Sequence, residues 1–456
     1  MGKLFGTDGI RGRANKELTP ELAFKMGRIV AHLLNRELKE DGSLSGERPF
    51  LVVGRDTRLS GTMLEGALCA GISSAGLDVR LLGIVSTPAV AFLTAQLKSA
   101  GGAMISASHN PVEDNGIKFF NRQGFKLSSE LEEEAERLFF TEEDNLPRPA
   151  GKKVGQFFRA EKALLNYLSF LKKHAPDVRG LKIALDCAHG SLSKIAPRLF
   201  KELEAEVITL CGTPRGEKIN VNCGSTNPAL LQKAVLEKKA QVGFAFDGDG
   251  DRLIAVDERG QVVDGDAVMA ICAAYLKEKN MLRGGKIVAT VMSNGGLELA
   301  GEKHGFSVLR TKVGDRYVLE EMLRGHYSLG GEQSGHIIFS DILATGDGLL
   351  TSLQLLKVMV EKGEPLSRLA AIMPRLPQLL VNCRVKNKDG WEQNPRIVEA
   401  VKAAEEKLPR GRIFIRASGT EPLLRIMLEG EDLQLLQKLS RELARIVEEE
   451  MGLLDI

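Results

Sequence analysis

Four stretches of this sequence share one pattern, in which an apolar run ends in a polar, glycine-containing turn. They are residues 50–57, 182–190, 286–293 and 412–419. The first three lead into segments with helical periodicity, which is the order of strand and helix in largely parallel α/β sheets. Because the stretches lie about a hundred residues or more apart, they do not fit solenoid repeats, whose periods are ~20–50 residues. The pattern therefore predicts separate domains, with α/β architecture for the first three.

The length of 456 residues is enough for roughly three or four such domains. Two proline-containing segments, 145–151 and 373–377, are predicted linkers, whereas a third boundary near residue 257 has no compositional mark. Residues 433–451 have helical periodicity with many charges, which indicates a surface helix packed on a small last domain. The acidic cluster at 130–136 is interpreted as a solvated helix face. The domains are predicted at 1–152, 153–257, 258–374 and 375–456.

Charge and cysteine usage restrict the class of protein. Charged residues are 27% and hydrophobic residues 43% of the chain, as in an ordinary soluble protein, and a net charge of +2 gives no argument for nucleic-acid binding. No apolar run approaches the ~20 residues that cross a bilayer, and the N-terminus lacks the apolar core of a signal peptide. We therefore expect a cytoplasmic protein with no membrane partner. Its six cysteines are scattered without a C-x-x-C motif, which favours reduced thiols over disulfides or a zinc site.

The segment 105–111, Ile-Ser-Ala-Ser-His-Asn-Pro, combines nucleophilic and basic side chains. An apolar run enters it, and Asn-Pro is typical of a turn, so Ser108 is expected to be exposed at a strand-to-loop junction. A hydroxyl beside the imidazole of His109 is a candidate nucleophile. An ordinary Ser/Asn-rich turn is the alternative. Lys118 is a candidate general base if burial or neighbouring cations lower its pKa, or else a surface lysine.

Residues 247–252, Asp-Gly-Asp-Gly-Asp-Arg, lie between two apolar runs. Glycines allow tight curvature, so Asp247, Asp249 and Asp251 can converge on one hard cation such as Mg²⁺. A solvated acidic turn is the alternative. An EF-hand does not fit, because Arg252 stands where the calcium loop needs glycine.

Three further loops carry polar groups suited to a phosphorylated sugar. Residues 330–336 offer a carboxylate, an amide and hydroxyl chemistry for a polyhydroxylated or amino-bearing ligand, and residues 312–316 add cations. Residues 416–422, with Arg425 beyond, form a candidate phosphate cradle. The glycine-rich segment 5–13 is either a flexible terminus or an anion-binding loop around Arg11. A helix should follow it, with Thr19 as N-cap and Pro20 at its first position.

A nucleophilic serine, a divalent-metal loop, a sugar-type loop and a remote phosphate cradle together indicate phosphoryl transfer. With these motifs in the order 6–12, 106–118, 247–252, 331–336 and 416–422, the chain resembles the α-D-phosphohexomutase superfamily over nearly its whole length. The resemblance implies an α/β fold of four domains around a central cleft. Three α/β domains would share one topology with mixed sheets, and a smaller α+β domain would be C-terminal. Residues 112–114 depart slightly from the aromatic-bearing version of the serine motif.

The resemblance also implies a reaction and a set of site residues. The reaction is the reversible conversion of glucosamine 6-phosphate to glucosamine 1-phosphate, which feeds UDP-N-acetylglucosamine synthesis, and Gln333 favours this branch over those acting on mannose phosphates. Ser108 would carry the phosphoryl group, and its phosphate would hold one Mg²⁺ per subunit with Asp247, Asp249 and Asp251. Predicted catalytic residues are Ser108, Lys118, Arg11, His109 and His336; substrate contacts are Glu332, Ser334, Arg252, Lys312 and Arg316; phosphate ligands are Arg416, Ser418, Gly419, Thr420 and Arg425.

Glucosamine or glucose 1,6-bisphosphate is the expected activator, and a homodimer is the usual assembly of the resembling family. Three alternatives stay open at this point. They are a superfamily member acting on glucose or mannose phosphates, a metal-dependent sugar-phosphate phosphatase, and a non-catalytic sugar-phosphate sensor with the same fold. A serine hydrolase is disfavoured because no G-x-S-x-G motif occurs, and no P-loop motif argues for direct use of ATP.

Overall fold

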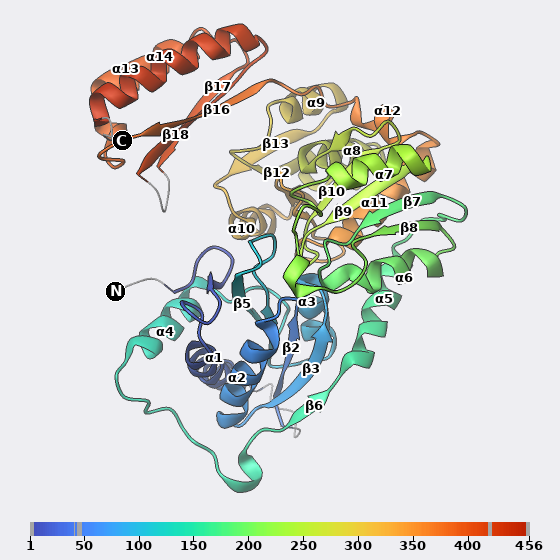
Figure 1. Cartoon of the computed structure of the whole chain (residues 1–456), viewed down its shortest axis with the longest axis vertical. Coiled ribbons are helices and arrows are strands. Elements are labelled where there is room, and N and C mark those ends of the chain that lie inside the picture. The colour runs from blue at the N-terminus through green and yellow to red at the C-terminus, as the bar shows by residue number, and fades with distance from the viewer. Residues whose placement is uncertain (1–3, 41, 43–47, 418–421, 453–456) are drawn as a thin grey trace. The chain divides into compact units, whose positions relative to one another are not determined.

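The computed structural model of the chain describes residues 4–40, 42, 48–417 and 422–452 (Figure 1). It divides into two compact units. The first is Met1–Met292 with Gly305–Ile372, and the second is Ser293–His304 with Met373–Ile456. The first unit holds three mixed sheets with helices, and the second holds one antiparallel sheet with helices, so the predicted α/β and α+β architecture is confirmed.

The first sheet, blue to teal in Figure 1, has the strand order β1-β5-β4-β2-β3-β6. Its strands are β1 (Ile10–Arg13), β2 (Phe50–Arg55), β3 (Asp78–Ile84), β4 (Gly101–Ile105), β5 (Asp114–Asn121) and β6 (Phe157–Arg159). β2 is parallel to β3 and β4, while β5 runs antiparallel to β4 and β1. β6 pairs with β3 although it lies beyond the boundary predicted at residue 152, so the chain adds an edge strand here before it leaves this sheet.

The helices of this part are α1 (Pro20–Glu40), α2 (Gly61–Ser74), α3 (Thr87–Gln96) and α4 (Ser129–Phe140). The expected start of α1 is confirmed, because the Thr19 hydroxyl accepts the Leu22 amide at 3.3 Å. α1 and α2 cross so closely that a Cβ on Gly71 would lie 2.1 Å from the carbonyl oxygen of Phe24. A larger residue at Gly71 would therefore separate the two helices that cover the buried core of this part.

The sequence suggested that the acidic cluster on α4 is a solvated helix face, but three of its carboxylates have partners in the structure. Glu132 is buried and forms a bidentate ion pair with Arg316 at 2.6 and 2.7 Å. Glu134 pairs with Arg36, and Glu136 accepts the amides of Leu4 and Phe5. These carboxylates tie α4 to other segments because their partners come from distant parts of the sequence.

The second sheet has the order β11-β10-β9-β7-β8. Its strands are β7 (Lys182–Asp186), β8 (Glu206–Leu210), β9 (Val242–Phe246), β10 (Leu253–Asp257) and β11 (Val262–Val263), and its helices are α5 (Leu164–Lys173), α6 (Ile195–Glu202) and α7 (Ala229–Lys238). β7 is parallel to β8 and β9, while β10 returns antiparallel between β9 and β11. The boundary predicted after residue 257 falls inside the β10–β11 hairpin, because Glu258–Gly260 is a turn of one sheet and not a linker.

The third sheet has the order β13-β12-β14-β15. Its strands are β12 (Lys286–Thr290), β13 (Ser307–Thr311), β14 (Leu329–Gly331) and β15 (Ile337–Phe339), and the helices of this part are α8 (Gly265–Glu278), α10 (Asp315–Gly325), α11 (Gly348–Lys362) and α12 (Leu366–Ala370). β12 is parallel to β13 and β14, and β14 pairs antiparallel with β15. Across the described residues, no helix is both long and apolar enough to span a bilayer.

The second unit contains β16 (Gln378–Arg384), β17 (Arg412–Ala417), β18 (Leu423–Glu429), α9 (Gly296–His304), α13 (Pro395–Glu405) and α14 (Leu433–Met451). β18 lies between β16 and β17 and is antiparallel to both. The predicted final helix is confirmed, since α14 buries Leu436, Leu439, Leu443 and Val447 on one face. The predicted linker 373–377 is held in this unit, because Asn294 accepts the amide of Leu376 at 3.0 Å and donates to its carbonyl at 2.9 Å.

Candidate active site

Ser108 lies in the loop that connects β4 to β5, as its motif predicted, but it is 1% exposed and not open to solvent. The turn at 247–250 covers it, since a Cβ on Gly248 would lie 2.6 Å from the Ser108 carbonyl oxygen. Its backbone is left-handed, with φ of +51°, an unusual conformation for serine. The hydroxyl donates to Asp247 Oδ2 at 2.5 Å and lies 3.2 Å from Nδ1 of His109. The candidate nucleophile is thus held within a buried polar site.

The three aspartates occupy the tight connection between the antiparallel strands β9 and β10. All three are buried, and one carboxylate oxygen from each lies within 4.8 Å of the others. Among the described residues, Oδ1 of Asp249 and Oδ1 of Asp251 have no hydrogen-bond donor. Burial, with the charges of Asp251 and Asp249, raises the pKa of Asp247 well above its ordinary value. Unpaired buried oxygens and mutual repulsion fit a site for a divalent cation with oxygen ligands, such as Mg²⁺.

Lys118 projects from β5 into the same site and is 1% exposed. Its Nζ lies 2.9 Å from Asp249, 3.0 Å from Asp8 and 3.5 Å from Asp251. Burial disfavours the ammonium ion, but these carboxylates outweigh it and raise the pKa of Lys118. The condition under which Lys118 was predicted to act as a general base, a lowered pKa, is therefore not met. Lys118 is a buried, protonated lysine, and in this state it is a proton donor.

A chain of ion pairs that the sequence reasoning missed extends from Lys118. Asp8 pairs with Arg11 and lies 2.6 Å from Lys126. Lys126 in turn lies 2.6 Å from Asp315, at the start of α10. Asp8 stands in the glycine-rich N-terminal motif, which could have marked it. Lys126 and Asp315 have no local signal, because their roles arise only where the segment after β5 meets the start of α10.

Two further predicted catalytic residues, Arg11 and His336, also reach the site. Arg11, on edge strand β1, donates to the side-chain oxygen of Asn110 at 3.2 Å, so residues 10–13 are a strand and not a flexible terminus. His336 is buried, with Nδ1 3.5 Å from Asp251 and Nε2 accepting the amide of Gly346 at 3.2 Å. Because Nε2 accepts, the imidazole carries its proton on Nδ1, facing the aspartate.

The predicted sugar loop is the turn between β14 and β15. Glu332 accepts the Gly314 amide at 3.1 Å, which leaves its other oxygen for a ligand. Within the described structure, the Ser334 hydroxyl and the Gln333 amide nitrogen are buried atoms without a hydrogen-bond partner. Arg252 is largely buried beside this turn, where its backbone bridges to His336. These groups provide the mixed donors and acceptors that a sugar needs.

Two predicted substrate contacts are placed differently. Arg316 is engaged by Glu132 through both terminal nitrogens, and its geometry gives it a role in joining α10 to α4. Lys312 is exposed, and its Nζ lies 6.0 Å from the ring centre of Tyr317.

The predicted phosphate loop belongs to the second unit. Ser418, Gly419 and Thr420 lie outside the described residues. Arg416 and Arg425 are opposite each other on the neighbouring strands β17 and β18. The two arginines are thus cross-strand neighbours, one on each side of the predicted loop in the sequence.

Histidine 109 and the helix after β3 complete the surroundings of Ser108 and the aspartates. Burial, together with Arg252 and Arg11, lowers the pKa of His109 to about 4. Thr87, at the start of α3, donates its hydroxyl to Asp249 at 2.5 Å. Asp249 therefore accepts from both a hydroxyl and an ammonium group through Oδ2, while its Oδ1 stays open.

Arg58 holds the loop that carries Ser108 in its conformation, and no sequence pattern indicated this role. Its guanidinium is completely buried and donates to four backbone carbonyls of this loop. These belong to Ser108 at 3.0 Å, Asn110 at 2.8 Å, Pro111 and Asp114 at 2.8 Å. Asp56 lies 3.1 Å from Arg58 and accepts the Ser106 hydroxyl at 2.5 Å. One buried ion pair thereby fixes both ends of the segment that carries Ser108.

Comparisons with known proteins agree with this arrangement. Family models for phosphoglucomutase/phosphomannomutase match in order: alpha/beta/alpha domains I, II and III at residues 2–146, 164–260 and 264–376, and the C-terminal domain at 380–446. Phosphoglucosamine mutases of Geobacillus thermodenitrificans and Carboxydothermus hydrogenoformans are 53% and 51% identical to the chain, covering 99% and 98% of it and 100% of each relative. A crystal structure of a phosphoglucomutase/phosphomannomutase family protein from Burkholderia thailandensis has a TM-score of 0.80 at 25% identity, over 98% of both chains. This chain therefore belongs to the phosphoglucosamine mutase family, a family of isomerases.

Proposed function

We propose that the chain interconverts glucosamine 6-phosphate and glucosamine 1-phosphate, with Ser108 as the phosphoryl carrier. The observation that carries this proposal is the 2.5 Å contact between the Ser108 hydroxyl and Asp247, within the buried aspartate trio. A nucleophile, three metal ligands and a buried ammonium group meet at one place. This is the set of groups that phosphoryl transfer to and from a side chain needs.

In the proposed cycle, phospho-Ser108 gives its phosphoryl group to the free hydroxyl of a bound hexosamine phosphate. The bond between Ser108 Oγ and phosphorus breaks and a bond to the sugar oxygen forms. The sugar hydroxyl loses its proton and Ser108 Oγ gains one, so a 1,6-bisphosphate and a free serine hydroxyl result. The bisphosphate then turns over, and its other phosphoryl group returns to Ser108. Added glucosamine or glucose 1,6-bisphosphate would keep the serine phosphorylated, which is the reason to expect it as activator.

Asp247, Asp249 and Asp251, with the phosphate of Ser108, would hold one Mg²⁺. This ion would neutralise charge on the transferring phosphoryl group. His109 lies within hydrogen-bonding distance of Ser108 Oγ and can take its proton when the serine attacks. Lys118, held among the aspartates, can supply a proton to the oxygen that the phosphoryl group leaves. Arg11 would also stabilise charge, since it reaches Asn110 of the serine loop.

A bound sugar that fills the site would exclude water from the phosphoryl group, and transfer to the sugar would then be favoured over hydrolysis. Glu332 and Ser334 are proposed to bind the sugar, and the Glu332 carboxylate suits the ammonium group of glucosamine. Arg416 and Arg425 stay the proposed phosphate ligands, and a homodimer stays the proposed assembly.

Ser108→Ala should abolish turnover even with bisphosphate activator present, with a loss of at least ~10³-fold in kcat, because no oxygen remains to accept the phosphoryl group. A coupled assay for glucosamine 1-phosphate measures this, and phosphopeptide mapping locates the phosphate in the parent protein. The matched control is Ser74→Ala, whose hydroxyl bonds only to the carbonyl of Gly71 and to Arg28. Ordinary turnover in Ser108→Ala would remove Ser108 from the mechanism.

Asp247→Asn should change the stability of the metal-free protein little, because relief of repulsion among buried carboxylates is offset by the loss of one of the two oxygens that accept from Ser108 and Arg252. The same change should abolish the stabilisation that Mg²⁺ gives the parent protein. Thermal unfolding with and without Mg²⁺ measures both effects. Asp177→Asn is the control, since Asp177 is an exposed carboxylate paired with Arg179. An unchanged response to Mg²⁺ in Asp247→Asn would contradict the assigned metal site.

Arg58 is proposed as a positioning residue, and its conservative variant separates positioning from folding. Arg58→Lys keeps a charge near Asp56 but cannot bond four carbonyls, so we expect a folded protein whose kcat is lower by about 10–100-fold with KM nearly unchanged. Arg58→Ala leaves Asp56 unpaired and should cost about 3–5 kcal/mol of unfolding free energy. If Arg58→Lys had the same kcat and the same stability as the parent protein, Arg58 would have only a structural role.

Glucosamine 6-phosphate should be preferred over glucose and mannose 6-phosphates by about 10–100-fold in kcat/KM, because a charge-assisted hydrogen bond is worth ~1.5–3 kcal/mol. Parallel coupled assays of the three substrates measure the preference. Glu332→Gln should reduce the preference for the amino sugar more than it lowers turnover of glucose 6-phosphate. Release of inorganic phosphate in place of an isomerised sugar would support the phosphatase alternative instead.

A further inference from the structure

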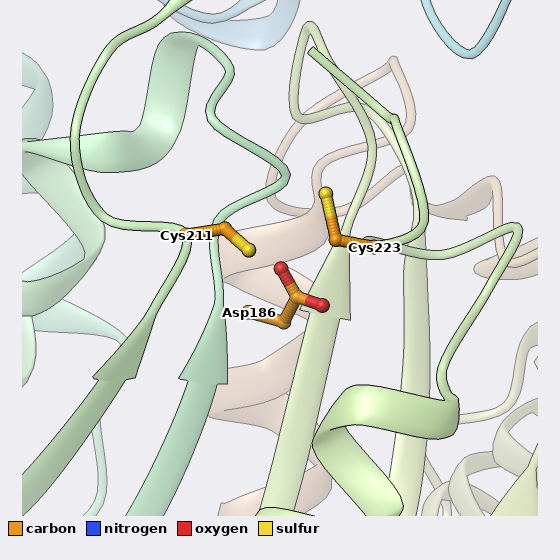
Figure 2. Close-up of side chains that lie close together, drawn as sticks. All are labelled: Asp186, Cys211 and Cys223. Atoms are coloured by element: carbon orange, nitrogen blue, oxygen red, sulfur yellow. The ribbon is translucent and has the colours of Figure 1, made fainter. Parts of the chain in front are cut away.

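A second cluster of metal-ligating side chains lies outside the proposed catalytic residues. Asp186 ends β7, Cys211 directly follows β8, and Cys223 stands in the loop that precedes α7 (Figure 2). The ligand atoms of the three residues all lie within 4.8 Å of one another. Asp186 and Cys223 are buried and Cys211 is partly exposed. Two sulfur atoms and a carboxylate from three separate segments therefore meet at the carboxyl end of the second sheet.

The backbone around this cluster is strongly constrained. Asp186 accepts the amides of Ala188 at 3.0 Å and Gly224 at 2.8 Å, which fixes the orientation of its carboxylate. Ala188 and Cys211 have left-handed backbones, with φ of +52° and +47°, although neither is a residue that favours this region. Strained backbone that holds reactive side chains together is a feature of functional sites.

We propose that Asp186, Cys211 and Cys223 bind one thiophilic divalent cation of the Zn²⁺ type. Cysteine sulfur and carboxylate oxygen are both ordinary ligands of Zn²⁺, whereas Mg²⁺ avoids sulfur, so the cluster differs in selectivity from the aspartate trio. Three protein ligands leave the fourth tetrahedral position for water, and the partly exposed side of Cys211 gives solvent access to it. The sequence argued against a zinc site, because these ligands share no short motif.

The six cysteines are free thiols in the structure. The sulfur atoms of Cys211 and Cys223 can therefore both act as ligands once a cation displaces their protons.

The cluster is connected to the loop of Ser108. The chain between Cys211 and Cys223 carries Asn220, whose side chain donates to the Ser108 carbonyl at 2.9 Å. The same segment packs on the turn before Arg58, since a Cβ on Gly216 would lie 2.2 Å from the carbonyl oxygen of Thr57. A cation that joins the two ends of this segment would hold Asn220 in place. A cation at the proposed site would therefore regulate activity by holding the serine loop in place. This consequence rests on the proposed role of Ser108.

Titration of the thiol-reduced, Mg²⁺-loaded protein with Co²⁺ tests the site through its ligand chemistry. We expect one Co²⁺ per chain that gives a thiolate-to-cobalt charge-transfer band, and Zn²⁺ should displace it. Cys211→Ser should lose the band while the protein stays folded, because Cys211 is partly exposed. Cys272→Ala is the matched control, since Cys272 is a buried thiol on α8 outside the cluster, and it should keep the band.

Three outcomes would overturn the proposal. They are absence of a thiolate band, a band unchanged in Cys211→Ser, and oxidation of the pair to a disulfide without cation uptake. Hydrogen exchange of residues 211–224 adds a readout independent of activity, and it should slow when Zn²⁺ is added to the parent protein but not to Cys211→Ser. Because neither readout depends on turnover, loss of the mutase assignment would leave the site intact, and loss of the site would leave the assignment intact.

Discussion

The structure depends on gathering four carboxylates, three of them buried, around one lysine. Asp8, Asp249 and Asp251 all lie within 3.5 Å of Lys118, and Asp247 is beside them. A buried charge without a partner costs several kcal/mol, so one ammonium group cannot balance this many carboxylates. The surrounding cations Arg11 and Lys126 offset part of the excess through Asp8. Arg252 lies beside Asp251 and offsets a further part. A divalent ion bound by Asp247, Asp249 and Asp251 would add to this compensation.

The serine loop shows how this charged site is kept in shape. A left-handed serine between Ala107 and His109 would relax in an isolated peptide, since serine does not favour that conformation. Arg58 holds it with bonds to carbonyl oxygens, which leave the Ser108 hydroxyl free for Asp247. The hydrogen bonds that stabilise the loop thus also position its serine, because the buried guanidinium of Arg58 has all its acceptors only when the loop has this conformation. A core of apolar residues could stabilise the same segment but would not aim its hydroxyl.

Local motifs predicted much of the site, and the differences at Ser108, Lys118 and Arg316 have one origin. The strand before Ser108, the aspartate turn and the cap of α1 follow from neighbouring residues, so sequence patterns could indicate them. Ser108 was expected to be exposed, and Lys118 was a candidate general base only if its pKa were lowered. Neither holds in the structure, because the segments that cover the serine and surround the lysine are more than a hundred residues away and have no local signal. The same applies to Arg316, whose partner Glu132 lies on another element. The boundary predicted at 257 lies at the hairpin between β10 and β11, and the sequence could not mark this turn because a hairpin turn and a linker have similar composition.

The carboxyl ends of parallel strands explain why two polar clusters arise in one domain. β7, β8 and β9 run in the same direction, so the residues that follow them meet at one edge of the second sheet. β9 leads into the aspartate turn, whereas β7 and β8 lead into Asp186 and Cys211. Gly190, which follows β7, is pressed against the aspartate turn, where a Cβ would lie 2.4 Å from the carbonyl oxygen of Gly248. Only a few tightly packed residues therefore separate the cluster of Asp186, Cys211 and Cys223 from the backbone of Ser108.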